Sequence, residues 1–217
     1  MKGEKVNIMN LKAIMRKGVI GVSLIHLFTL SLILVSCSEE NTTEDEYANW
    51  QERNEAKIDQ WAALANNGTY QKILTYTKDA STPGLENGDY IYYEVLETGD
   101  GKESPLYTDT VRVAYRGRLI PTTSYSDGYV IDQTYLNDFD WNTANMTDYA
   151  ASNFVNGFTT ALMNMHPGDH WRVYIPYQLG YGSSGSTTIK GYSNLTFDIA
   201  LKTFWHPGEQ MEMFKSR

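Results

Sequence analysis

Cysteine, histidine and positive charge are scarce in this 217-residue sequence, which contains one Cys, four His and 18 Lys+Arg against 26 Asp+Glu. A single thiol cannot close a disulfide within the chain or build a multi-thiolate metal site. The formal net charge of -8 offers no broad positive field to nucleic-acid phosphates. We therefore expect one or two domains, no cofactor and no nucleic-acid partner.

The sequence also lacks an apolar run long enough for a typical transmembrane helix, which needs roughly 20 apolar residues. Its longest apolar run covers the 17 residues Val19–Val35, follows Arg16 and Lys17, and includes His26 and several hydroxyl groups. This layout is typical of a signal peptide, which we assign to residues 1–36. An uncleaved anchor with a buried thiol is the alternative, but it does not explain why the single Cys follows the run.

The residues at the end of this run, Leu34-Val35-Ser36-Cys37, resemble the lipobox of bacterial lipoproteins. The resemblance implies that Cys37 is acylated and anchors the protein to a membrane. The acidic residues after it (37–46) predict a solvated tether and resemble export signals of Bacteroidota lipoproteins. We expect an outer-membrane lipoprotein of the bacterial envelope, facing either the periplasm or the cell surface.

The charge is divided unevenly at this cleavage site. Residues 1–36 contain five basic side chains and one acidic side chain, so the remaining 181 residues carry 13 basic and 25 acidic groups, a net charge of -12. Anionic lipid would repel such a domain, so the expected membrane contact is the lipid on Cys37.

Residues 47–84 are predicted to form a helical arm and a linker. Thr43 and Glu46 have capping-box spacing, and Asn66-Asn67-Gly68 supplies a stop after a helix of about 20 residues. Its apolar stripe recurs at three- and four-residue steps: Tyr47, Trp50, Asn54, Ile58, Trp61 and Ala65. The stripe could serve a homodimer, but we favour packing against the same chain.

The pattern changes from helical to alternating after Gly84. Four segments have the period of two expected of half-buried strands: DYIYYEVLE, DTVRVAYRGRLI, DHWRVYIP and NLTFDIALKTF. Between them, residues 153–166 have helical spacing. The prediction is an α+β domain over residues 85–206, with an antiparallel sheet and one core helix, followed by a tail at 207–217.

Four blocks in this region resemble the FKBP-type peptidyl-prolyl cis-trans isomerases in order and spacing. They are AYRGRL, DG followed by Asp132, NGFTTALMNMHPGDHWRVYIPYQLGYG, and NLTFDIALKTF. The resemblance implies an antiparallel sheet wrapped around a short helix, with an apolar cleft that receives proline. It also implies isomerisation of X-Pro bonds in peptides or unfolded protein segments, and assistance to folding in the envelope.

The resemblance implies site residues one by one. Tyr115, Tyr181 and Phe197 would form aromatic walls, with Val155 beside the floor, and Asp132 would organise hydrogen bonds at the rim. At two positions the chain departs from the family, with Ile131 for a usual Phe and Phe158 for a usual Trp on the floor. These substitutions predict a looser pocket that binds more weakly. Residues 133–153 match the family poorly.

Two other function classes stay open at this stage. A module that holds proline-containing segments without isomerising them is favoured by Ile131 and Phe158. A glycan-binding surface lipoprotein is suggested by the aromatic-rich segment 135–149.

Two motifs are set aside. Residues 180–185 match G-x-G-x-x-G, but a loop and a strand follow where a nucleotide site needs a helix. His166 and His170 have zinc-like spacing, but Pro167-Gly168 interrupts the helix that would align them.

Overall fold

A computed structural model describes residues 45–211, and the signal segment and Cys37 lie outside this range. The helices are α2 (Trp50–Asn66), α3 (Asn156–Leu162) and the single-turn η1 (Asn87–Asp89), η2 (Ala151–Asn153) and η3 (Tyr177–Leu179). The strands are β1 (Gln71–Leu74), β2 (Tyr90–Glu97), β3 (Thr110–Leu119), β4 (Val130–Gln133), β5 (Thr147–Ala150), β6 (His170–Ile175) and β7 (Leu195–Trp205). Within 45–211, no helix is both long and apolar enough to cross a bilayer.

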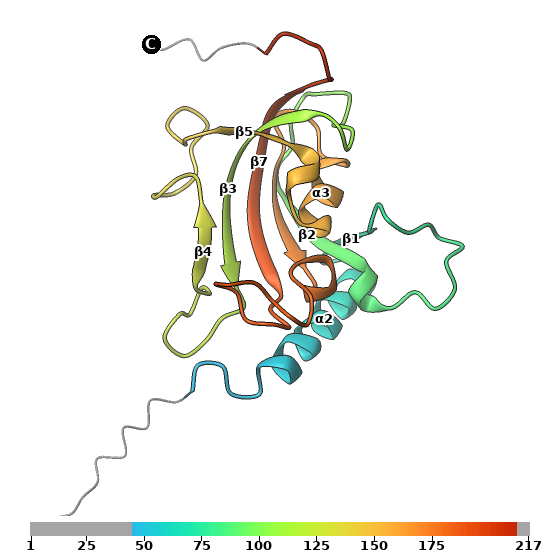
Figure 1. Cartoon of the computed structure of the whole chain (residues 1–217), viewed down its shortest axis with the longest axis vertical. Helices are drawn as coiled ribbons and strands as arrows, with labels where there is room; N and C mark the ends of the chain where they lie inside the picture. Colours follow the sequence, from blue (N-terminus) through green and yellow to red (C-terminus); the bar gives the residue numbers. More distant parts are fainter. Residues whose placement is uncertain (1–44, 212–217) are drawn as a thin grey trace, which may run out of the picture. The chain divides into compact units, whose positions relative to one another are not determined.

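The strands form one antiparallel sheet in the order β1-β2-β6-β7-β3-β4 (Figure 1). The short strand β5 lies on the same edge of β3 as β4 and pairs with the first residues of β3, Thr110 to Val113. The predicted α+β class and the four alternating segments are confirmed. The long strand β3 pairs along its whole length with β7, from Thr110 opposite Trp205 to Leu119 opposite Leu195.

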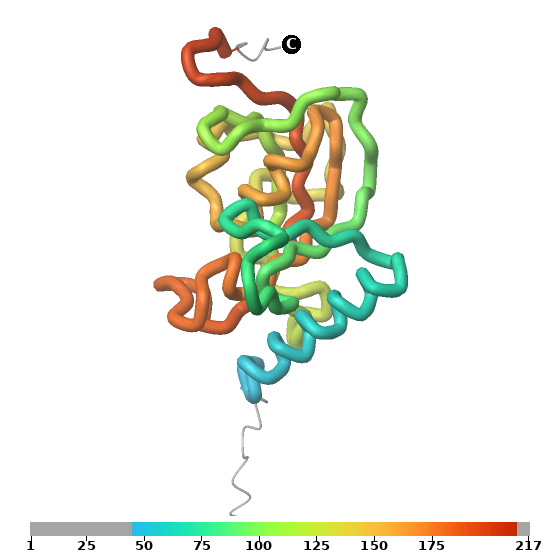
Figure 2. The backbone as a smooth tube through the Cα atoms, turned by 90° about the vertical axis from the view of Figure 1, so that its right-hand side faces the viewer, coloured from blue at the N-terminus to red at the C-terminus, as the bar shows by residue number. Residues whose placement is uncertain are grey.

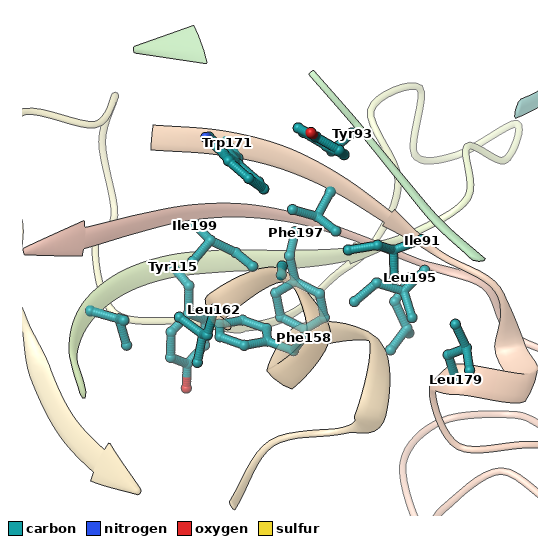
Figure 3. Close-up of a cluster of buried hydrophobic side chains, with 14 of the residues drawn as sticks. Ile91, Tyr93, Tyr115, Phe158, Leu162, Trp171, Leu179, Leu195, Phe197 and Ile199 are labelled. Atoms are coloured by element: carbon teal, nitrogen blue, oxygen red, sulfur yellow. The ribbon is translucent and has the colours of Figure 1, made fainter. Parts of the chain in front are cut away.

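Alternation along the strands sends apolar side chains to the face that carries α3. Val111, Val113 and Tyr115 of β3 all belong to the main core, whereas Ala114 belongs to a small cluster on the other face. Helix α3 contributes Phe158, Ala161 and Leu162, each at most 1% exposed. Figure 3 shows Phe158 and Leu162 of α3 among core side chains of the sheet such as Tyr115 and Phe197. Removal of so much apolar surface from water is the main stabilisation of the fold.

Helix α2 uses its apolar stripe within its own chain. Trp50 belongs to the main core, and Ile58, Trp61 and Ala62 pack with Tyr92 of β2 in a second cluster. Figure 1 shows α2 across one end of the sheet, which lets a single helix reach both clusters. Trp50, Asn54, Ile58 and Trp61 of the predicted stripe are buried within their own chain, whereas Ala65 is half-buried and Tyr47, which precedes the helix, is exposed.

The start of α2 differs from the prediction. The helix begins at Trp50, after Asn49 in a left-handed conformation (φ 50°) that has no side-chain cap. The Glu46 carboxylate, expected in a capping box, instead accepts a hydrogen bond from the Ser124 N–H at 2.9 Å. The tertiary contact with the loop before β4 competes with the local cap. The predicted stop is confirmed, because α2 ends at Asn66 and Gly68 has φ +83°.

The sheet begins earlier than expected. Residues 71–74, predicted as part of a linker, form β1 and pair with β2 from Gln71 opposite Tyr93 to Leu74 opposite Tyr90. Residue 84 is therefore not a boundary of the fold, and the described residues from Glu46 onward belong to one compact unit. The predicted helix 153–166 is also longer than α3, because a turn at Met163–Asn164 ends it.

Residues 133–153 contain the short strand β5 and an aromatic segment against the sheet face opposite α3. Tyr135, Phe139 and Trp141 pack there with Ala114 and Ala200. Trp141 donates a hydrogen bond from Nε1 to Glu97 at 2.9 Å, and the Phe139 ring centroid lies 4.3 Å from that of His170. These aromatics, which suggested a glycan ligand in the sequence, largely cover the sheet.

Candidate functional site

A cavity of about 540 Å³ opens where α3 meets β3 and β7. Its walls come from six parts of the chain: β3, β4, β5, the η2–α3 segment, the loop before β7, and β7. The lining residues are Tyr115, Ile131, Asp132, Tyr149, Asn153, Phe154, Val155, Phe158, Tyr181, Ser186, Thr188, Ile189 and Phe197. A cavity of this size and composition suits a small apolar group.

Aromatic rings form the floor and two walls of this cavity. The Phe158 ring meets Phe197 edge to face at 5.1 Å between centroids and Tyr115 at 5.6 Å. Phe154 stacks on Phe158 at 4.2 Å with 12° between planes. Edge-to-face and offset-stacked rings hold one another in place. Figure 3 shows Tyr115, Phe158 and Phe197 converging between the sheet and α3.

Asp132 on β4 is held beside Tyr115 on β3. The Tyr115 hydroxyl donates a hydrogen bond to Asp132 Oδ2 at 2.8 Å. Burial, together with the hydrogen bond to Asp132 and its negative charge, raises the pKa of Tyr115 well above its ordinary value. Tyr115 is therefore a neutral donor at physiological pH, and its hydroxyl holds the carboxylate at the cavity rim.

The position of Phe197 depends on a glycine in the neighbouring strand. Gly117 lies opposite Phe197 in the β3–β7 register. A Cβ atom at Gly117 would lie 2.3 Å from Cε1 of the Phe197 ring, closer than any normal contact. Phe197 is 6% exposed and forms a wall because the missing side chain leaves room for its ring.

The loop from Gly180 to Ser193 forms the remaining side of the cavity. Tyr181 is 40% exposed at the mouth, whereas Ile189 is 6% exposed and faces inward among the lining residues. Gly182 (φ +68°) and Gly185 (φ +71°) supply the left-handed conformations that fold the loop back on itself.

All seven pocket residues predicted from the sequence line this one cavity: Tyr115, Ile131, Asp132, Val155, Phe158, Tyr181 and Phe197. The prediction missed Tyr149, Asn153, Phe154, Ser186, Thr188 and Ile189 as lining residues. Phe154 could have been found from its place beside Val155 at the helix start. Tyr149 lies in a four-residue strand, which is too short to give a clear alternating pattern. Cys37 lies outside the described residues.

The motifs set aside have local roles. His166 and His170 each lie near a different carboxylate, Asp169 at 3.7 Å and Glu97 at 3.4 Å. Across residues 45–211, no three His, Cys, Asp or Glu side chains lie close enough together to hold a metal ion. The glycine motif at 180–185 is followed by a loop and then β7. The cavity thus presents aromatic rings and, at its rim, the Asp132 carboxylate, which the Tyr115 hydroxyl restrains.

Comparison with known proteins agrees with this geometry. The family model described as FKBP-type peptidyl-prolyl cis-trans isomerase matches residues 101–202. The macrophage infectivity potentiator of Trypanosoma cruzi is 34% identical over 131 residues, which cover 60% of this chain and 61% of that protein. The peptidyl-prolyl cis-trans isomerase Mip of Coxiella burnetii is 34% identical over 118 residues, covering 53% and 45% respectively.

Among solved structures, FkpA from Escherichia coli aligns with a TM-score of 0.50 at 21% identity, covering 94% of this chain and 98% of that chain. This likeness shows a shared fold. The matched part of the chain spans less than two thirds of the length of the two curated relatives above. Every residue of the cavity falls within residues 101–202, the part of the chain that matches the family model of the FKBP-type peptidyl-prolyl cis-trans isomerases.

Proposed function

We propose that the protein catalyses cis-trans isomerisation of X-Pro peptide bonds in unfolded or flexible protein segments. The observation that carries this proposal is the aromatic cavity with the Tyr115–Asp132 hydrogen bond at its rim. The pyrrolidine ring of proline would occupy the space above Phe158, between Tyr115 and Phe197.

The chemistry needs no nucleophile and no metal, because no bond is made or broken. Amide resonance raises a rotational barrier of about 20 kcal/mol, and a catalyst must bind the twisted amide better than the planar one. Removing water from the planar amide's oxygen costs more than removing it from the less polar twisted amide. The buried rings of Phe158 and Phe197 would exclude that water, so the site lowers the barrier by desolvation.

The polar groups at the rim would fix the peptide's direction. Tyr181 at the mouth carries a hydroxyl that is proposed to donate to a peptide carbonyl. Ser186 and Thr188 lie on the same loop and offer further hydrogen-bonding groups to the flanking residues. Asp132 is the acidic residue among the lining groups, and Tyr115 restrains it.

An isomerisation assay tests the proposal directly. Purified full-length chain at micromolar concentration should accelerate cis-trans exchange of an Ala-Leu-Pro-Phe peptide, measured by NMR exchange or a protease-coupled rate. Absence of acceleration, with peptide binding retained, would reject catalysis and support the alternative of a non-catalytic peptide-binding module.

The alternative draws its support from Ile131 and Phe158, where the family usually has larger aromatic groups. Phe158→Trp separates the two functions. A large rate gain at unchanged peptide affinity would indicate a site that binds but has lost catalytic power, whereas an unchanged rate would indicate that the Phe154–Phe158 stack already suffices.

We further propose that the protein works in the bacterial envelope as an outer-membrane lipoprotein, where it assists protein folding. Supporting this are the signal-like segment 1–36, the lipobox-like sequence ending at Cys37, and a relative from Legionella longbeachae named outer membrane protein MIP. Incorporation of a labelled fatty acid into the protein, and its loss in Cys37→Ser, would test the anchor.

A homodimer through α2 is the weaker proposal for its partners. Trp50, Ile58 and Trp61 are each at most 4% exposed within their own chain, so a dimer would have to use the polar side of the helix. Sedimentation of the purified protein tests this point.

A further inference from the structure

The loop from Gly180 to Ser193, here called the site loop, supplies four of the cavity's lining residues: Tyr181, Ser186, Thr188 and Ile189. It connects η3 to β7 and contains no strand of the sheet. Its internal bonds are turns, such as Gly185 N–H to Tyr181 O at 3.1 Å and Ser186 N–H to Ile189 O at 2.8 Å. Such a loop needs contacts from elsewhere to hold one conformation.

The first of these contacts comes from Trp50 at the start of α2. Its indole Nε1–H donates to Ser193 Oγ at 2.9 Å, and the Ser193 hydroxyl in turn donates to the Lys190 carbonyl at 2.6 Å. Trp50 is 3% exposed and Ser193 is 1% exposed. One buried hydroxyl therefore joins the helix to the residue that follows Ile189.

The second contact lies one helical turn further on. Asn194 donates its backbone N–H to Asn54 Oδ1 at 2.8 Å and its side-chain Nδ2–H to the Asn54 carbonyl at 2.7 Å. Asn194 Oδ1 accepts the Tyr177 N–H at 2.9 Å, and the Tyr177 carbonyl accepts the Gly182 N–H at 2.8 Å. Both asparagines are fully buried. This chain of bonds reaches from α2 to the residue beside Tyr181.

The two contacts hold the site loop near both of its ends, and Figures 1 and 2 show the loop beside α2. Buried polar groups are costly when unpaired, so this network strongly favours a single arrangement of helix and loop. Tyr181 and Ile189 depend on that arrangement for their places at the cavity.

We infer that α2, which precedes the family-matched region 101–202, is part of the isomerase site, with Trp50 and Asn54 as positioning residues for the site loop. The inference rests on the proposed function for its effect on rate. Its structural content, a loop whose order depends on α2, stands independently of catalysis.

Two tryptophans on the same helix provide a matched experiment in the full-length chain. Trp50 and Trp61 are each 3% exposed, but Trp61 packs on Tyr92 and Tyr174 of the sheet at 6.3 and 5.3 Å between centroids. Trp50→Phe removes the bond to Ser193 and keeps an aromatic ring. Trp61→Phe makes the same substitution away from the site loop.

Loss of one buried hydrogen bond to the loop should lower kcat/KM about three- to tenfold in Trp50→Phe. Trp61→Phe should retain the wild-type kcat/KM, although urea unfolding should show both variants to be less stable than the wild type. Amide exchange of Gly182, Gly185 and Ser186 should accelerate in Trp50→Phe alone. Ser193→Ala should lower kcat/KM less in the Trp50→Phe variant than in the wild type, because Trp50 and Ser193 share one hydrogen bond.

Equal exchange rates for those amides in both variants would overturn the inference, as would an equal loss of kcat/KM. If the wild-type chain does not isomerise peptides, the proposed function fails, and amide exchange alone decides whether α2 positions the loop.

Discussion

Individual residues set the shape and polarity of the cavity. The Gly117–Phe197 pair fixes one wall by the absence of a side chain, and the Tyr115–Asp132 pair fixes the rim by one hydrogen bond at 2.8 Å. Both pairs join neighbouring strands of the sheet, so strand register controls the site directly.

Gly117→Ala tests the wall. The added methyl group would overlap the Phe197 ring and force it towards the cavity, so we expect a stability loss of about 1–3 kcal/mol and at least about a tenfold fall in kcat/KM. Urea unfolding and the peptide assay measure the two effects. Gly88→Ala is the control, because the nearest atoms to its methyl group belong to the flexible end of Gln178, which does not line the cavity. Unchanged activity in Gly117→Ala would show that Phe197 is not a wall of the active site.

Tyr115→Phe tests the rim. It removes the hydroxyl but keeps the ring, and Asp132 is exposed, so water can replace the lost donor. We expect a stability loss of about 1 kcal/mol and a two- to tenfold fall in kcat/KM, roughly the effect of one hydrogen bond. Tyr125→Phe, at an exposed tyrosine outside the cavity lining, should change neither quantity. An equal effect of both substitutions would contradict a specific role for the Tyr115 hydroxyl.

At the scale of elements, short strands and loops are attached to the sheet by side chains. Strand β5 has four residues and carries Tyr149 to the cavity. Arg112 on β3 binds Asp148 on β5 through two hydrogen bonds of 2.7 Å, and the Arg112 guanidinium lies 4.7 Å from the Trp205 ring centroid. The pair compensates for the few backbone bonds that so short a strand can form.

Asp148→Ala should therefore loosen β5. Arg112 is 8% exposed, and removing its carboxylate partner should cost roughly 2–4 kcal/mol of unfolding free energy. Lys78→Met, which breaks the more exposed Lys78–Asp89 pair, should cost less than about 1 kcal/mol. Denaturant unfolding compares the two variants, and similar losses would mean that the β3–β5 pair has no special structural role.

Sequence patterns predicted the positions of the helices and long strands better than they predicted the tertiary contacts between them. Alternation in β2, β3, β6 and β7 is strong because each strand buries one face against α3, and these four strands follow the predicted segments closely. β1 and β5 were missed because four residues give too little periodicity, and tertiary pairing decides their conformation. The capping box at Glu46 was wrong because the carboxylate binds Ser124, 78 residues away.

At the scale of the whole molecule, His170 and His206 make opposite contributions to the pH dependence of the free energy of unfolding. Burial lowers the pKa of His170 below its ordinary value of 6.5, although the Glu97 hydrogen bond opposes this. The Asp109 hydrogen bond raises the pKa of His206. The unfolded chain thus binds protons more readily than the native state at His170 and less readily at His206.

Linkage converts these shifts into a prediction. The His170 contribution is present above pH 6.5 and is lost as pH falls from 6.5 through its lower native pKa, whereas the His206 contribution is present below pH 6.5 and is lost as pH rises through its higher native pKa. His170→Gln should therefore reduce the acid-side loss of stability, and His206→Gln should reduce the loss on the alkaline side. Urea unfolding between about pH 5 and 8 measures both slopes. Slopes identical to the wild type would contradict the assignment.

The sequence by itself determined the α+β class, the main strands, and the seven pocket residues that the structure brings to one cavity. These features follow from local periodicity and from four recognisable blocks. Tertiary structure decided that α2 supports the site loop, that β5 adds Tyr149, and that Gly117 makes room for Phe197. Each of these depends on contacts between residues far apart in the chain. The spacing of apolar residues within a segment shows which face is buried but does not identify the distant residues that this face contacts.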